Sequence, residues 1–164
     1  QRERDQLTGL YNKQTVEKKI SEKLAETITK DAYVVLTDVD DFKAMNDSMG
    51  HLFGDGVLCT FANSLVELFP EGIIGRIGGD EFIVMGTVNS EKEVRDYWTA
   101  VEAEVEKYNQ KNDKKAQLSF SYGYDVFKMS ASTYLEECIK VTDEKMYQNK
   151  KQKKLARAEQ LKEN

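Results

Sequence analysis

Two short β-type segments near the middle of the chain constrain the fold more than any other feature. Residues 73–77 (Ile-Ile-Gly-Arg-Ile) and 82–85 (Phe-Ile-Val-Met) are separated by residues 78–81, Gly-Gly-Asp-Glu. Paired glycines between β runs are typical of a hairpin, because tight hairpin turns need positive φ angles that glycine adopts at little cost. We therefore expect two adjacent antiparallel strands joined by a glycine turn.

Hydrophobic periodicity places helices and strands alternately on both sides of this hairpin. Apolar residues at every fourth position from Val16 to Ile28 follow a helix-capping Asn12, which predicts a first helix. The order of the elements is typical of an α+β fold, with a mostly antiparallel central sheet flanked by helices and a ferredoxin-like split βαβ core. The remaining elements are expected as strands over 32–37 and 118–126 and helices over 57–68, 94–108 and 132–147.

Composition narrows the class of protein. The chain has 164 residues, of which 40% are hydrophobic, enough to enclose one core. A single histidine, His51, excludes a zinc site built from several histidines. Cys59 and Cys138 lack metal-ligand spacing, so we expect buried free thiols in a reducing cytosol. No apolar run approaches the about 18 residues that cross a bilayer, and from the first residues we expect no signal peptide.

Charge is distributed unevenly along the chain. The formal net charge is -5, yet the segment from Lys145 to the end holds seven Lys or Arg against two Glu. The body is therefore strongly acidic and the tail basic. An acidic body disfavours polymeric nucleic acid as a partner, because such partners are bound through a basic surface.

Two acidic clusters are candidates for chemistry. Asp38, Asp40 and Asp41 follow the first strand, while Asp80 and Glu81 lie at the hairpin. If these strands are neighbours, the carboxylates meet, and carboxylate and carbonyl oxygens are the ligands that Mg²⁺ prefers. Metal ions shared in this way promote in-line attack at phosphorus. The alternative is that turns are simply rich in Asp and Gly.

Four separated blocks of the chain stand out together: residues 5–12 (Asp-Gln-Leu-Thr-Gly-Leu-Tyr-Asn), 38–55, 76–82 (Arg-Ile-Gly-Gly-Asp-Glu-Phe) and 143–150. In this order they resemble the GGDEF family, the diguanylate cyclases of bacterial signalling. This family condenses two GTP into cyclic di-GMP and releases pyrophosphate twice, using two domains that face each other antiparallel. The resemblance therefore implies an enzyme, a nucleotidyltransferase of nucleotide-cyclase-like fold.

The resemblance implies a divalent metal site and a catalytic pair. Asp38, the backbone carbonyl of Val39, and Asp80 would hold Mg²⁺ or Mn²⁺, two ions per half-site, with Glu81 near the second ion. Asp80 also matches the position assigned as proton acceptor for the attacking 3′-hydroxyl. Because cations lower the pKa of a nearby carboxylate, the metal role of Asp80 is the stronger expectation.

The resemblance also implies a guanine-reading pair. Asn46 and Asp55 match these positions, and a carboxylate can accept from the N1 and N2 donors of guanine. Some family members that make mixed purine dinucleotides carry Ser at the position that matches Asp55, so Asp here favours guanine at both sites. His51 matches a substrate-binding position, and bracing its loop is an equal alternative.

Phosphate contacts are implied for several cations. Lys43, Lys150 and Lys154 match such positions, and a short helix starting at Phe42 would add backbone N–H groups. For Arg76 the sequence leaves two alternatives, a phosphate contact or an ion pair with an acidic neighbour.

The chain departs from the family pattern in two places. Residues 153–155 are Lys-Lys-Leu where the family usually ends its last helix with Gly-Arg-Asn, so the helix is free to continue towards Asn164. Residues 69–72 (Phe-Pro-Glu-Gly) replace the Arg-x-x-Asp inhibitory motif. We therefore expect no strong product inhibition through that site.

We expect residues 1–12 to be a lead-in from an upstream helix or linker, 13–150 the GGDEF catalytic domain, and 151–164 a basic helical tail. The resemblance implies GTP as substrate, an antiparallel homodimer, and an upstream sensor domain on a cytoplasmic protein, or the cytosolic side of a membrane-anchored one. No membrane contact is expected of this domain. The alternatives are a catalytically weak GTP-binding regulatory domain and a purely structural module.

Overall fold

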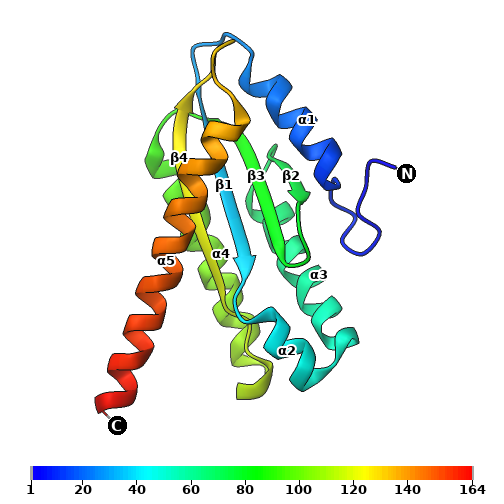
Figure 1. The fold of residues 1–164 in the computed structure, drawn as a ribbon, viewed down its shortest axis with the longest axis vertical. Coiled ribbons are helices and arrows are strands. Elements are labelled where there is room, and N and C mark those ends of the chain that lie inside the picture. The colour runs from blue at the N-terminus through cyan, green and yellow to red at the C-terminus, as the bar shows by residue number, and fades with distance from the viewer. Residues whose placement is uncertain (1, 164) are drawn as a thin grey trace.

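A four-stranded antiparallel sheet forms the centre of the computed structural model, which describes residues 2–163. The strand order is β2-β3-β1-β4, so β3 is inserted between β1 and β2 (Figure 1). This is the split βαβ arrangement, and the predicted α+β fold is confirmed. The strands are β1 (Asp31–Val39), β2 (Ile73–Arg76), β3 (Glu81–Val88) and β4 (Phe120–Lys128).

Five helices cover the two faces of the sheet. Successive residues of β1 alternate between two cores: Tyr33 and Val35 pack with α3 and α4, while Val34 and Leu36 pack with α1 and α5. Figure 1 shows α1 beside β2 and α5 along β4. The helices are α1 (Lys13–Leu24), α2 (Phe42–Met49), α3 (His51–Leu68), α4 (Glu91–Gln110) and α5 (Leu135–Glu163), with a short 3₁₀ helix, η1 (Lys114–Ala116).

The first helix begins as predicted and ends early. The Asn12 side chain accepts a hydrogen bond from the backbone N–H of Thr15, so the predicted N-cap is confirmed. The predicted extension to Ile28 is wrong, because α1 ends at Leu24. The β-branched run Thr-Ile-Thr at 27–29 has low helix propensity, which favours an end before it.

The hairpin forms, but its glycines do not act as expected. Neither Gly78 nor Gly79 has a positive φ angle; within the described chain only Gly9 and Gly50 do among the glycines. The reversal takes four residues, 77–80, which is long enough to avoid left-handed backbone. A Cβ atom on Gly79 would meet nothing within 4 Å, so neither the space around it nor its backbone conformation requires glycine there.

Helix α5 lies directly on the backbone of β4. A Cβ atom on Gly123 would come within 2.2 Å of the backbone of Thr142 and Met146, so only glycine permits this approach. The helix continues through the basic segment to Glu163, as the sequence allowed. Over the residues that the structure describes, none of the helices has a stretch long and apolar enough to span a membrane.

The two cysteines are free thiols, as predicted. Cys138 is buried, whereas Cys59 is only half-buried, so the expectation of burial is wrong for Cys59. Its thiol lies beside the lead-in segment and donates to the carbonyl of Leu7 (3.3 Å).

Candidate active site

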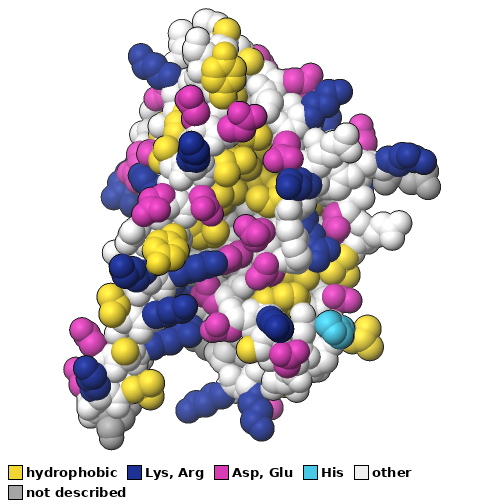
Figure 2. All heavy atoms as spheres, viewed as in Figure 1, with side chains coloured by type: hydrophobic (Ala, Val, Ile, Leu, Met, Phe, Trp, Pro, Cys, Tyr) yellow, Lys and Arg dark blue, Asp and Glu magenta, His cyan; other side chains and the backbone are white. Residues whose placement is uncertain are grey.

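The end of β1 and the hairpin bring the two acidic clusters together. Asp38 is the register partner of Glu81, and the N–H of Val39 donates to the carbonyl of Asp80 (3.2 Å). Figure 2 shows acidic side chains gathered near the middle of this face, beside a row of Lys and Arg side chains. The end of β1 and the start of β3 are therefore neighbours, which is what a meeting of the two acidic clusters requires.

Asp38 is the most buried carboxylate of the cluster, with 5% of the residue exposed. Its Oδ2 accepts from Lys150 Nζ (2.5 Å), while its Oδ1 is buried without a hydrogen-bond partner among the described residues. Burial raises the pKa of Asp38 to about 6; Lys150 opposes this shift, and Asp80 and Asp40 add to it. Asp38 is therefore a buried acid with one oxygen free for a ligand.

Asp40, two residues on, has a different environment. It accepts from the hydroxyls of Ser119 (2.7 Å) and Ser121 (2.6 Å) and from the ammonium of Lys153. Burial alone would raise the pKa of Asp40, but these hydrogen bonds outweigh it and hold the pKa below its ordinary value. Asp40 is thus an ionised structural anchor whose oxygens are already engaged.

A cavity of about 180 Å³ opens between these acids and α5. It brings together three predicted metal or catalytic positions, Asp38, Val39 and Asp80, with the predicted phosphate contacts Lys150 and Lys154. The carboxylate of Asp41 pairs across it with Arg157 (3.4 Å). Its other lining residues are Asp40, Ser121 and Lys153.

Glu81 is not among the residues that line this cavity. Its Oε1 lies 3.1 Å from the position of a Cβ on Gly78, so the side chain folds back over the hairpin. The predicted contact of Glu81 with a second ion therefore stays a prediction.

The donor set fits a hard divalent cation. Across residues 2–163 there is no group of three or more His, Cys, Asp or Glu side chains that could hold a metal ion. Mg²⁺ nevertheless needs only one or two carboxylates when waters and phosphates complete its shell. The unpartnered Oδ1 of Asp38, with Asp80 and the carbonyl of Val39 beside it, meets that requirement.

The predicted guanine-reading residues come from α2 and α3. A Cβ on Gly54 would lie 1.8 Å from Asn46 Oδ1, so the Asn46 amide packs against the bare backbone of α3. That Oδ1 is buried without a partner among the described residues. Asp55 follows Gly54 and is half-buried, while His51 is exposed at the first position of α3. Asn46 therefore contacts α3 at Gly54, the residue that precedes Asp55.

The remaining predicted contacts lie outside the cavity. Phe42 begins α2 and packs half-buried against the core, and Lys43 is exposed in the first turn. Arg76 pairs with Asp5 (3.1 Å) and donates to the carbonyl of Gly79 (2.7 Å). Of the two alternatives for Arg76, the structure shows the acidic partner, which ties the lead-in to the hairpin.

The sequence reasoning missed Lys153 and Arg157. Both turn towards the acidic turn after β1, whereas the exposed Lys154 forms no ion pair within the described residues. Their spacing from Lys150, three and seven residues, is the period of one helix face and was the available signal. Spacing alone does not say which face meets the sheet.

The geometry agrees with comparisons to known proteins. The family model for the diguanylate cyclase GGDEF domain matches residues 2–155, so the chain belongs to this family. The chain is 29% identical over 149 residues to diguanylate cyclase VdcA of Vibrio cholerae and 27% identical over 152 residues to the probable diguanylate cyclase DgcJ of Escherichia coli. These alignments cover 89% and 91% of this chain but only 43% and 29% of those proteins, so the chain spans less than half of each.

Solved structures share the fold. The GGDEF domain of DgcB from Caulobacter crescentus, in complex with c-di-GMP, superposes with a TM-score of 0.82 at 22% identity, covering 92% of this chain and 91% of that one. A microbial GGDEF domain described in a novel interaction mode with cyclic di-GMP gives a TM-score of 0.77 at 27% identity, covering 92% and 94%. The predicted family and fold are confirmed.

Proposed function

We propose that this domain is an active diguanylate cyclase, which condenses two GTP into cyclic di-GMP and releases two pyrophosphates between two antiparallel copies. The observation that carries the proposal is the unpartnered Oδ1 of buried Asp38, in a cavity that Asp80 also lines, while the other oxygen, Oδ2, accepts from the ammonium of Lys150. A free carboxylate oxygen next to cations suits a metal-bound triphosphate.

Asp38, Asp80 and the carbonyl of Val39 would hold Mg²⁺ or Mn²⁺, with Glu81 towards a second ion. When bound, the ions would neutralise charge on the phosphates and acidify the 3′-hydroxyl. Asp80 accepts the proton of that hydroxyl, and its half-buried position at the hairpin leaves it accessible to a nucleotide from the second copy.

Binding of the substrate is divided between the two sides of the site. Asn46 and Asp55 read the guanine edge, and the close contact of Asn46 with Gly54 supports a preshaped base pocket. Lys150, Lys154 and Lys43 contact phosphates, as do backbone N–H groups at the start of α2. His51 reaches the substrate from the start of α3, and Arg76 acts through the hairpin that it braces.

One observation favours the second candidate, a GTP-binding regulatory domain of weak catalysis. Lys150 occupies one oxygen of Asp38, and Lys153 occupies Asp40, so cations of the protein already neutralise much of the acidic cluster. Metal binding then has to compete with an internal ion pair, which would weaken turnover.

The proposed whole protein is larger than this domain. Its relatives extend beyond the matched region, and one solved neighbour is the diguanylate cyclase SiaD of Pseudomonas aeruginosa in complex with its activator SiaC. We expect an upstream sensor that pairs two copies on the cytosolic side.

Incubation of purified protein with GTP and Mg²⁺, followed by separation of the nucleotides, tests the proposal. A dimerising coiled coil fused ahead of Gln1 keeps the two copies together. Cyclic di-GMP that is formed by the wild type and lost in Asp80→Ala supports the cyclase. GTP binding without product supports the regulatory domain instead.

A further inference from the structure

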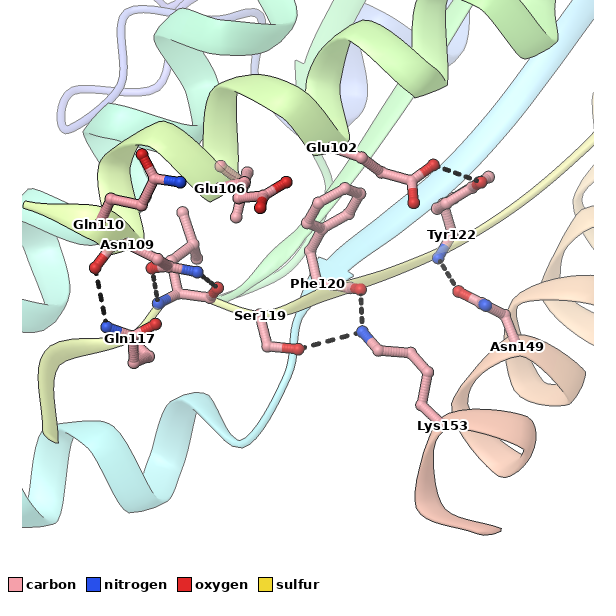
Figure 3. Close-up of a pocket in the computed structure, with 12 residues that line it drawn as sticks. Glu102, Glu106, Asn109, Gln110, Gln117, Ser119, Phe120, Tyr122, Asn149 and Lys153 are labelled. Atoms are coloured by element: carbon pink, nitrogen blue, oxygen red, sulfur yellow. Dashed lines mark hydrogen bonds between the residues drawn. The ribbon is translucent and has the colours of Figure 1, made fainter. Parts of the chain in front are cut away.

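Lys153 joins three elements of the fold at one point. From α5 its ammonium donates to the Asp40 carboxylate, to the Ser119 hydroxyl (3.0 Å) and to the Phe120 carbonyl. Figure 3 shows Lys153 reaching from α5 to Ser119 and to Phe120, the first residue of β4, with both hydrogen bonds drawn. An ammonium has three donors, and all three are used here.

The partners of Lys153 are themselves fixed. Asp40 accepts from Ser121 as well as Ser119, and its backbone N–H donates to the carbonyl of Ser119 (2.7 Å). Asp40 also lies in the turn between Asp38 and the start of α2. A contact to this point therefore ties α5 to the segment that carries the metal-ligand candidates.

Lys153 is the last half-buried residue of α5 within the described chain. Before it, the side chain of Asn149 accepts from the N–H of Tyr122 (2.9 Å) on β4. After it, every described residue of α5 is exposed, and the Arg157 contact is long at 3.4 Å. The neighbouring Lys151 is exposed and forms no ion pair within residues 2–163. It thus offers a matched control.

Lys150 stands one turn before this anchor, with its ammonium on Asp38. To contact a phosphate in the cavity, the Lys150 ammonium uses its remaining donors or turns away from Asp38, and in either case its reach depends on where the helix holds its backbone. As long as the backbone of α5 stays in place, the Lys150 ammonium can reach the cavity. If this end of α5 loosened, Lys150 would move away from the cavity. The contacts of Lys153 supply that fixed backbone.

We infer that Lys153 is a positioning residue for nucleotide binding, one that holds α5 against Asp40 and β4 so that Lys150 serves the phosphate. This inference rests on the proposed function. Lys153 stands where the family motif usually has glycine. The contact between Lys153 and Asp40 therefore depends on a residue that the usual motif does not supply.

The test compares Lys153→Met with Lys151→Met. Both remove one charge and keep the aliphatic stem, but only the first breaks the anchor. We expect the dissociation constant for a non-hydrolysable GTP analogue with Mg²⁺ to rise about tenfold in Lys153→Met, as for loss of a supporting partner of a binding group. Amides 154–163 should also exchange hydrogen faster. Lys151→Met should match the wild type in both measurements.

Two further variants separate positioning from general stability. In a double-mutant cycle, Asp40→Asn with Lys153→Met should weaken nucleotide binding no more than either change alone, because both break one contact. Lys153→Arg should restore most of the affinity. Equal affinity in Lys153→Met and Lys151→Met overturns the inference, as does a lowered melting temperature with unchanged affinity.

The proposed function fails separately from this inference. A dimerised wild type that binds the analogue and makes no cyclic di-GMP contradicts the cyclase, yet the comparison of Lys153 with Lys151 remains measurable and decisive.

Discussion

The two sides of the candidate site are built on different principles. On the side that we propose binds phosphates, the phosphate side, Asp38, Asp40 and Asp41 each pair with a different basic residue of α5. On the side that we propose reads guanine, the guanine side, the Asn46 amide keeps a buried oxygen without a partner among the described residues and packs against the bare backbone at Gly54. One side is organised by charge pairing and the other by shape.

The difference follows from the cost of burying each kind of group. A carboxylate taken out of water needs a compensating charge, so the acidic turn requires a cationic helix across it. A neutral amide carries no charge to compensate, and the space for the Asn46 amide comes from the missing side chain of Gly54 in the facing helix. The phosphate side should therefore respond to charge and pH, and the guanine side to volume.

The largest effect is expected on the phosphate side. Lys150→Met removes the cation on Asp38 and a proposed phosphate contact, so cyclic di-GMP formation should fall about a hundredfold, as when one preorganised electrostatic partner is lost. Nucleotide separation after incubation with GTP and Mg²⁺ measures this. Lys151→Met is the control, and an equal rate in the two variants would remove Lys150 from the site.

A volume change should act on the guanine side. In Gly54→Ala the new methyl would lie 1.8 Å from Asn46 Oδ1, forcing the amide away. We expect GTP affinity to fall about tenfold and stability to fall by about 1–3 kcal/mol from overpacking. Titration calorimetry and denaturant unfolding measure the two effects.

Gly56 provides the matched control, because a Cβ there would meet nothing within 4 Å. Gly56→Ala should leave GTP affinity unchanged and stabilise α3 by about 0.5–1 kcal/mol. Equal loss of affinity in both variants would show that the contact of Asn46 with Gly54 does not shape the pocket.

Two neighbouring carboxylates should respond to pH with opposite signs. The raised pKa of Asp38 means that its native form binds a proton more tightly, so its contribution to stability falls as pH rises from 3.8 to about 6. The lowered pKa of Asp40 gives a contribution present above pH 3.8 and lost as pH falls through the lowered value.

Asp38→Asn should therefore gain stability over the wild type as pH rises from about 4 to 6, by at most about 3 kcal/mol. Asp40→Asn should be less stable than the wild type by nearly the same amount at pH 4 and pH 7, and the gap should close only as pH falls further. Unfolding curves with a chelator present, taken at pH 4 and pH 7, compare the two variants. Parallel pH profiles would contradict the contrast between a buried acid with a free oxygen and an ionised anchor.

The smallest effect is expected at the hairpin. Arg76→Met removes the ion pair with Asp5 and the hydrogen bonds to Gly79, at a cost of about 1 kcal/mol for a partly exposed pair. Faster hydrogen exchange at residues 77–80 should accompany it. Unchanged exchange there would show that the lead-in does not brace the hairpin.

Sequence reasoning reached the main features of the fold because they follow from local patterns. The hairpin formed where paired glycines stood, although the turn uses four residues and no positive φ at Gly78 or Gly79. The meeting of Asp38 with Asp80 followed once the strands were assigned as neighbours. These features depend on hydrophobic periodicity and on the position of glycines, and both can be read directly from the sequence.

The missed contacts depend on distances across the fold. Arg76 pairs with Asp5, 71 residues away in sequence, and no spacing rule links them. Lys154 was expected at the site and lines the cavity, whereas Lys153 was missed, because the face of α5 that meets the sheet depends on packing such as the close approach at Gly123. That packing becomes visible only once the helix lies on the strand.

The most direct test of the central claim is the stoichiometry of the reaction in a dimerised wild-type protein. With GTP and Mg²⁺, the account predicts cyclic di-GMP with two pyrophosphates released for each product molecule, and neither in Asp80→Ala. GTP that is bound and recovered unchanged by the dimerised wild type would contradict the claim.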